Sequence, residues 1–146
     1  MKKVYVSLIA DLLHAGHINI LKKASELGEV TVGLLTLKAC GELNDIPYLD
    51  YDKRKAVLEN LIIIKNVVLQ NTASYLDNLR KLKPDFVVHG DDWKTTSQKK
   101  YREEVIDELS KWNGKLIEIP YTQKPNIIKR KKNIKNLFLK AESRVG

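Results

Sequence analysis

The stretch "KVYVSLIADLLHAGHINILKKASELGEVTVGLL", residues 3–35, decides the fold class. It opens with an apolar run of strand-favouring residues, and after "DLLHAGH" it continues with apolar residues at helical spacing, such as Leu21 and Ala24. A second apolar run starts at Glu29, directly after the helical pattern. A strand, a helix and a strand in this order form a parallel crossover when the helix packs back on the sheet. The stretch therefore predicts an α/β fold.

The same alternation continues along the chain. Strand-like runs occupy Lys3–Ile9, Glu29–Thr36, Asn66–Gln70, Asp85–His89 and Lys115–Ile119. Helical patterns lie between them, and Asp50 is a candidate N-cap for the helix that "YDKRKAVLENLI" predicts. Regular alternation of this kind predicts a Rossmann-like, doubly wound parallel sheet of about five strands. Ligands of such sheets bind beyond the carboxyl ends of the strands, where "DLLHAGH" and "HGDDWKT" are expected to lie.

The composition fits one compact domain. The chain has 146 residues, 43% of them hydrophobic, and no apolar run reaches the length of a membrane span. The first residues superficially resemble a signal peptide, but Asp11 and His14 interrupt the apolar run early. The single cysteine, Cys40, forms no internal disulfide, which favours a reducing, cytoplasmic location.

The excess of positive charge lies in the C-terminal segment. Of the 26 Lys and Arg residues, eight follow residue 123, against one acidic residue, so residues 1–123 are nearly neutral. Apolar residues within 127–138 have the spacing of an amphipathic helix with one basic face. We expect 123–146 to be a basic C-terminal helix or tail docked on the sheet, with a dimer contact, an anionic membrane surface and nucleic acid as alternatives. The neutral body argues against a nucleic-acid partner, and no membrane partner is expected.

Two histidines and a glycine stand at the predicted junction of the first strand and the first helix. His14 and His17 are three residues apart and share one face of a helical turn. Gly16 lets a ligand come close, and the helix start offers backbone N–H groups and a positive dipole end to an anion. This combination favours phosphate groups. A metal site would have only Asp11 nearby, a purely structural role stays open, and no GxxxxGK[ST] loop occurs.

Three motifs in the same order resemble the HxGH nucleotidylyltransferase superfamily and its cytidylyltransferase branch. They are "DLLHAGH", "YDKRKAVLEN" and "HGDDWKT", and the resemblance covers residues 1–122 as a cytidylyltransferase-like domain. In detail the chain is similar to the cytidylyltransferase domain joined to phosphoenolpyruvate mutase in phosphonate biosynthesis. The resemblance implies transfer of CMP from CTP to a small phosphonate or phosphate acceptor, with release of pyrophosphate. It also implies Mg²⁺ bound with the CTP, and a homodimer.

The resemblance also implies which residues form the site. The expected catalytic residues are His14 and His17, on the transition state and the leaving pyrophosphate, and Arg54, on a phosphate. The expected nucleotide-binding residues are Ser7, Asp11, Gly16, Lys38, Gly90, Asp91, Asp92, Trp93 and Thr122. No metal-ligating residue is expected. His89, at the end of a strand, is expected to cap or to pack.

Departures from the family pattern support an alternative function. "SLIAD" places Ile9 where relatives have a hydroxyl residue, and the loop "KACGELNDIPYL" has Asn44 and Asp45 where a basic pair is expected. "QKPNIIKRKK" replaces a hydroxyl-rich turn, with Lys124 and later basic residues as substitute charge. Each lost contact to the transition state costs roughly 10²–10³-fold in rate. The alternative is therefore a degenerate relative that binds nucleotide with little or no turnover.

Overall fold

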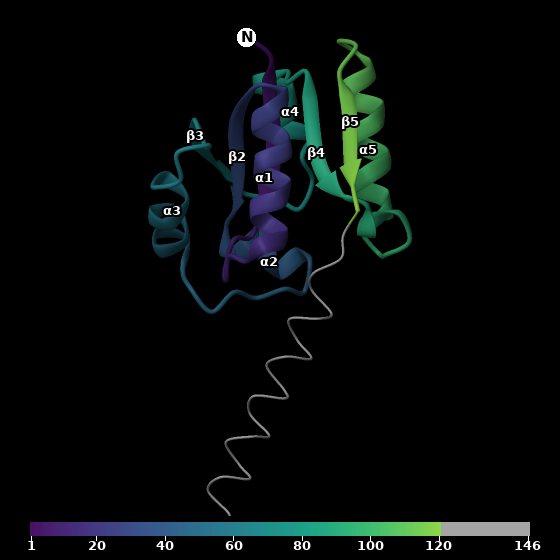
Figure 1. Cartoon of the computed structure of the whole chain (residues 1–146). Helices are drawn as coiled ribbons and strands as arrows, with labels where there is room; N and C mark the ends of the chain where they lie inside the picture. The colour runs from purple at the N-terminus through teal and green to yellow at the C-terminus, as the bar shows by residue number, and fades with distance from the viewer. Residues whose placement is uncertain (121–146) are drawn as a thin grey trace, which may run out of the picture.

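The computed structural model describes residues 1–120, which fold around one parallel sheet with the strand order β3-β2-β1-β4-β5 (Figure 1). The strands are β1 (Lys3–Leu8), β2 (Glu29–Leu35), β3 (Asn66–Gln70), β4 (Phe86–Gly90) and β5 (Lys115–Ile119). The helices are α1 (Ala15–Leu27), α2 (Leu37–Glu42), α3 (Tyr51–Glu59), α4 (Leu76–Leu82) and α5 (Lys99–Ser110), with the 3₁₀ helix η1 (Asp91–Lys94). The predicted Rossmann-like, doubly wound sheet is confirmed. The predicted segment 123–146 lies outside the described residues.

The strand order reverses beside the central strand. β2 and β3 extend the sheet on one side of β1, and β4 and β5 extend it on the other side. Val4 and Tyr5 of β1 pair with Phe86 and Val87 of β4, so the two halves of the sheet meet there. The helices that follow these strands diverge to opposite faces, which leaves a crevice at their carboxyl ends.

Helices cover both faces of the sheet (Figure 1). On one face, Leu21 of α1 and Leu58 of α3 join the larger apolar cluster, which includes Val6. On the other face, Leu79 of α4 and Leu109 of α5 form a second cluster with aromatic residues. Burial on both sides explains why the strands read as nearly continuous apolar runs. None of the helices within residues 1–120 has the length and apolar character that crossing a membrane requires.

Side-chain caps fix where two helices near the strand ends begin. Asp50 accepts a hydrogen bond from the Lys53 N–H at 3.1 Å, which confirms Asp50 as the N-cap of α3. Thr36 Oγ1 accepts from the Ala39 N–H at 3.2 Å and caps α2. The predicted loop "KACGELNDIPYL", residues 38–49, is wrong for residues 38–42, which belong to α2, and is confirmed for the residues after them. A short helix forms there because the cap is present and because Ala39 and Cys40 are buried against the end of β2.

Candidate active site

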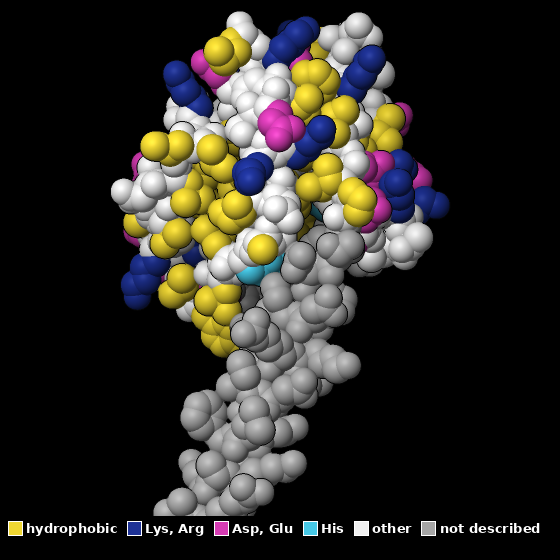
Figure 2. Space-filling view, in the orientation of Figure 1, with side chains coloured by type: hydrophobic (Ala, Val, Ile, Leu, Met, Phe, Trp, Pro, Cys, Tyr) yellow, Lys and Arg dark blue, Asp and Glu magenta, His cyan; other side chains and the backbone are white. Residues whose placement is uncertain are grey.

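A pocket of about 200 Å³ opens at the carboxyl ends of β1 and β4, where the strand order reverses. β1 contributes Ser7, β4 contributes His89 and Gly90, α1 contributes His17, and the loop after α2 contributes Asp45. In Figure 1 the arrowheads of β4 and β5 point toward this end of the molecule, and Figure 2 shows histidine atoms, in cyan, at the same end. This is the place at which the strand order predicts a ligand site.

His14 and His17 cap the first turn of α1 with their own rings. His14 Nδ1 accepts a hydrogen bond from the Gly16 N–H at 3.0 Å, and His17 Nδ1 accepts from the His14 N–H at 3.2 Å. These bonds form a capping box in which imidazoles replace the usual hydroxyl and carboxylate. The two ring centroids lie 4.1 Å apart. Local helix chemistry therefore brings the two histidines of the motif together.

The capping bonds fix the tautomer of both rings. A ring nitrogen that accepts a hydrogen bond carries no proton, so neutral His14 and His17 are protonated at Nε2. His17 lines the pocket, and His14 and Gly16 lie next to it in the same helical turn. Nε2–H donors at the positive end of a 13-residue helix suit an anionic oxygen.

Asp11, a predicted nucleotide-binding residue, holds the loop that precedes α3. Its two carboxylate oxygens accept hydrogen bonds from the backbone N–H groups of Tyr48 and Leu49, each at 2.9 Å. A short turn after β1 directs the carboxylate to this loop, with Ala10 at a φ of 53°. Asp11 does not line the pocket, and its predicted contact with nucleotide stays a prediction.

Arg54, a predicted catalytic residue, is fully buried. Its Nη1 donates to the carbonyls of Ile9 and Leu35 at 2.9 and 2.7 Å, and its Nε donates to the Leu49 carbonyl at 3.0 Å. Arg54 Nη2 is the one buried side-chain nitrogen or oxygen without a partner in residues 1–120. Because Ile9 and Leu35 line the pocket, the guanidinium places positive charge behind the pocket wall. Its predicted contact with a phosphate stays a prediction.

Trp93, expected to help seat the nucleoside, belongs to the core. It is 1% exposed, and its Nε1 donates a hydrogen bond to the Glu118 carboxylate at 2.9 Å. One face of its ring stacks on His89, with centroids 3.7 Å apart and planes 4° from parallel. Tyr75 packs against it at a centroid distance of 5.7 Å. Trp93 therefore supports the pocket wall from behind, and His89 forms that wall.

The remaining predicted residues divide into two groups. Those that line the pocket are Ser7, Gly90 and Asp92. Lys38 does not line it, since its Nζ donates to the Asn71 carbonyl at 3.2 Å and lies 3.8 Å from the Glu42 carboxylate. Asp91 begins η1 and also stands outside the lining. Thr122 lies outside the described residues.

Several lining residues were not predicted for the site. They include His89, Tyr75, Gln98 and Tyr101. Strand alternation offers a signal for the first of these, because His89 shares a face of β4 with Val87 and follows it toward the carboxyl end. Tyr75 and Gln98 are the N-cap residues of α4 and α5, and Tyr101 lies in the first turn of α5. The approach of these two helices to β1 cannot be derived from local sequence.

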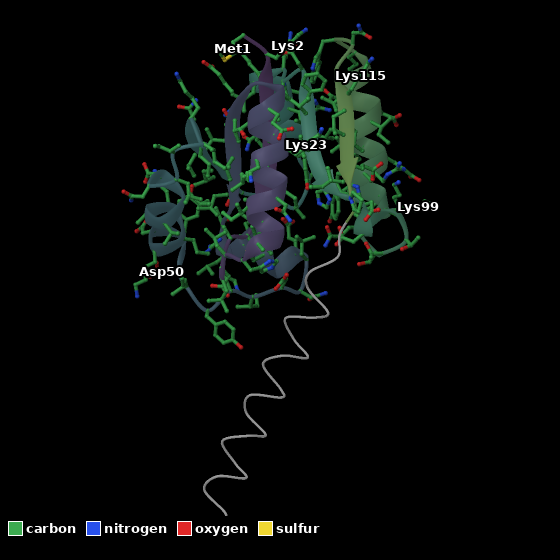
Figure 3. All side chains as sticks on the ribbon, viewed as in Figure 1. Met1, Lys2, Lys23, Asp50, Lys99 and Lys115 are labelled. Atoms are coloured by element: carbon green, nitrogen blue, oxygen red, sulfur yellow. The ribbon has the colours of Figure 1, made fainter. Side chains whose placement is uncertain are left out.

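The electrostatics of the pocket are unusual for an anion site. Among the described residues its lining contains no Lys or Arg, and it contains the carboxylates of Asp45 and Asp92. Figure 3 shows the labelled Lys2 and Lys115 at the opposite end of the sheet. Burial raises the pKa of Tyr75, so its phenol stays protonated. Burial also lowers the pKa of His89, so this imidazole is neutral at pH 7.

The doubly wound sheet and the histidine pair at the start of its first helix define a member of the nucleotidylyltransferase superfamily. The sequence profile of the cytidylyltransferase-like family matches residues 9–138. The chain belongs to this family, which confirms the resemblance that its three motifs indicate.

Individual relatives support the same family. The glycerol-3-phosphate cytidylyltransferase of Staphylococcus aureus is 34% identical over 98 residues, which cover 64% of this chain and 72% of the relative. The bifunctional protein HldE of Campylobacter concisus is 36% identical over 98 residues, 64% of this chain and 20% of that protein. The crystal structure of the lipopolysaccharide core biosynthesis protein from Thermoplasma volcanium superposes with a TM-score of 0.72 at 25% identity, over 84% of this chain and 99% of that one.

Proposed function

We propose that this protein is a CTP-dependent cytidylyltransferase that transfers CMP to a small phosphonate or phosphate acceptor and releases pyrophosphate. The observation that carries the proposal is the pair of imidazoles that cap α1 beside the pocket, each protonated at Nε2. Two N–H donors at a helix N-terminus match the charge that develops on phosphate oxygens during phosphoryl transfer. Membership of the cytidylyltransferase-like family supports the choice of CTP.

The proposed reaction is a single displacement at phosphorus. An oxygen of the acceptor phosphonate or phosphate attacks the α-phosphorus of CTP and forms a new P–O bond. The bond between the α-phosphorus and the bridging oxygen breaks, and pyrophosphate leaves with the electron pair of that bond. His17, on the pocket wall, and His14, beside it, donate from Nε2 to the oxygens on which charge accumulates. The buried Arg54 adds positive charge behind the pocket wall, and its contact with a phosphate belongs to the same proposal.

Mg²⁺ is the expected cofactor. The described residues contain no group of three or more His, Cys, Asp or Glu side chains that could hold a metal ion by themselves. Their lining of the pocket also lacks Lys and Arg, and a triphosphate that binds as a magnesium complex carries part of its neutralising charge with it. When bound, Mg²⁺ would supply charge neutralisation at the triphosphate.

Several finer features belong to the same proposal. We infer a phosphonate acceptor from the motif resemblance, whereas a curated relative is named for glycerol 3-phosphate. A homodimer is proposed from the small size of the domain, and a cytoplasmic location from the single cysteine. Phosphonate and phosphate acceptors both attack through an oxygen bound to phosphorus, so the proposed reaction is the same for either class.

A second candidate function is nucleotide binding with little turnover. The observation that favours it is the Asp45 carboxylate on the pocket wall, in a described lining without Lys or Arg. A carboxylate repels a triphosphate and leaves the transition state less stabilised than a lysine would. The two candidates share a binding site and differ in the rate of pyrophosphate release.

Calorimetry with CTP and Mg²⁺, together with pyrophosphate release over a panel of phosphonates and phosphates, separates the two candidates. We expect binding and release, and we expect His17→Ala to lower the rate at least roughly 10²-fold. Asn19→Ala, an exposed change two residues further along α1, should leave the rate unchanged. Binding without release would establish the second candidate. Absence of CTP binding would refute both.

A further inference from the structure

We propose that His89 is a ligand-binding residue of this pocket, whose Nε2 accepts a hydrogen bond from an N–H or O–H group of the nucleotide or of the acceptor. The proposal rests on the function proposed above and adds a residue that the motifs do not assign. His89 is the last residue but one of β4, and it lines the pocket. Its side chain is 18% exposed, so it is mostly enclosed but not sealed.

The tautomer of His89 is fixed by its neighbours. His89 Nδ1 lies 2.7 Å from the Gly90 carbonyl oxygen. A carbonyl oxygen only accepts, so Nδ1 carries the proton and the neutral ring has its lone pair on Nε2. The Asp92 carboxylate, 3.9 Å from Nδ1, favours the same arrangement. His89 therefore has the opposite tautomer to His14 and His17.

The orientation of the His89 ring is also fixed. Trp93 stacks on one face at 3.7 Å and is itself tied to Glu118 through its indole N–H. Glu118 stays in place through Arg102, which donates to it at 2.9 Å. Within residues 1–120, Nε2 of His89 has no hydrogen-bond partner and is not among the buried unpartnered atoms. Nε2 is therefore open to the pocket that the ring lines.

The histidines place hydrogen-bond donors on one side of the pocket and an acceptor on the other. At the α1 side, His14 and His17 donate from Nε2, which suits phosphate oxygens. At the β4 side, His89 Nε2 accepts, and the nearby Asp92 carboxylate also accepts. An ionised phosphate has no hydrogen to donate, so it gains nothing at the β4 side. The group that His89 binds is therefore a neutral donor, such as the amino group of cytosine, a ribose hydroxyl, or the amine or hydroxyl of an acceptor.

Nitrogen NMR of the ¹⁵N-histidine-labelled full chain tests this directly, because the sequence has only three histidines. We expect two spectra of the Nε2–H type, from His14 and His17, and one of the Nδ1–H type, from His89. On saturation with CTP and Mg²⁺, or with aminoethylphosphonate or glycerol phosphate alone, the His89 Nε2 resonance should move toward the protonated range. The ligand that moves it identifies the source of the donor.

Two substitutions provide an independent test by calorimetry. His89→Phe keeps a flat ring against Trp93 but has no acceptor, and we expect about 5- to 10-fold weaker binding of the ligand that moves the resonance. His89→Gln restores an amide oxygen and should recover part of the loss. Asn19→Ala serves as the control for an exposed change. If His89→Phe does not fold, His89→Gln and the NMR of the parent chain still decide the question.

The failures of the two proposals are distinguishable. An Nε2–H tautomer at His89, or an Nε2 resonance that no ligand moves while CTP binds, would overturn the role of His89 and leave the proposed function standing. Equal CTP and acceptor affinities for the parent and His89→Phe would do the same. If the parent chain binds neither CTP nor any acceptor, the proposed function falls, and the role of His89 falls with it.

Discussion

Arg54 is the residue whose surroundings differ most from those its motif suggests. A cation in a phosphate-binding family is expected to face the ligand, yet this guanidinium is enclosed and donates to three backbone carbonyls. Two of these carbonyls, of Ile9 and Leu35, lie 45 and 19 residues away in the sequence. The sequence around Arg54 does not predict its hydrogen bonds to these two carbonyls, because the carbonyls come together only when β1 and β2 pair. The motif therefore predicts that Arg54 belongs to the site, but it does not predict the backbone carbonyls to which Arg54 donates.

Arg54→Met should destabilise the fold strongly. The substitution removes the guanidinium donor from three carbonyls, of which, within residues 1–120, only that of Leu35 keeps another donor, the Cys40 thiol, and we expect the free energy of unfolding to fall by about 3 kcal/mol or more. Urea unfolding followed by circular dichroism measures the loss. Lys53→Met, an exposed neighbour on the same helix, should change stability by less than about 0.5 kcal/mol. An unchanged midpoint for Arg54→Met would show that these three hydrogen bonds do not stabilise the fold.

At the scale of helices and strands, the sequence predicts most of the architecture. The strand ends agree with the structure to within one residue because both faces of the sheet are buried and the apolar runs are continuous. α2 was missed because its six residues, Leu37–Glu42, show no apolar period and depend on a cap and a buried Ala-Cys pair. α3 ends at Glu59, earlier than predicted, where the chain turns toward β3.

The end of α4 offers a test of backbone strain. Lys83 is the C-cap residue, with a φ of 44° and a ψ of 58°, a left-handed conformation that favours glycine. We expect Lys83→Gly to raise the free energy of unfolding by about 0.5–1 kcal/mol. Lys81→Gly, two residues earlier within the same helix, should lower it by up to about 1 kcal/mol. Thermal unfolding of the two variants should thus give shifts of opposite sign, and a loss for both would contradict the assignment of strain.

Glu108 connects α4 to α5 in a pH-dependent manner. Hydrogen bonds from Arg80 and from Lys111, each at 2.8 Å, lower the pKa of this carboxyl below its ordinary value of 4.5. A pKa that is lower in the folded state adds stability above the unfolded-state value, and this stability is lost as the pH falls through the folded-state value. Glu108→Gln should therefore be less stable than the parent at pH 7, and the gap should close as the pH falls below 4.5.

Urea midpoints at pH 7 and at about pH 3 measure that gap. Glu26→Gln is the matched control, because Glu26 lies 3.9 Å from Lys23 in an exposed pair on α1. Exposed pairs contribute little to stability, so the control should behave like the parent at both pH values. A Glu108→Gln deficit of equal size at both pH values would indicate lost packing rather than a lost charge.

At the scale of the whole molecule, the position of the pocket could be predicted but its wall could not. The order of strands and helices predicts that "DLLHAGH" and "HGDDWKT" meet at one edge of the sheet, and the pocket lies there. Which side chains of "HGDDWKT" line the pocket depends on the packing between α5, η1 and β5. That packing buries Trp93 and stacks His89 on it at the pocket wall, so His89 packs as expected, and the contact of Trp93 with the nucleoside stays a prediction.

The net charge of the pocket lining, like the composition of its wall, depends on residues from distant parts of the chain. Residues 1–123 are nearly neutral, and the described pocket lining holds Asp45 and Asp92 but no Lys or Arg. Asn44, the neighbouring position where relatives are expected to be basic, has a φ of 55°, a conformation that asparagine tolerates and lysine does not favour. A cation is therefore better introduced at position 45 than at position 44.

Asp45→Lys should tighten the binding of CTP in the presence of Mg²⁺. Replacing a negative by a positive side chain on the pocket wall removes a repulsion and adds an attraction, and we expect about a 10-fold gain in affinity, or about 1.4 kcal/mol. The gain should shrink at high salt, since the charges are partly screened. Asp107→Lys, an exposed change on α5 that alters the net charge equally, should leave the affinity unchanged. Calorimetry at low and high salt measures both variants. Weaker binding by Asp45→Lys would mean that the carboxylate serves the bound ion, and the repulsive role assigned to Asp45 would be wrong.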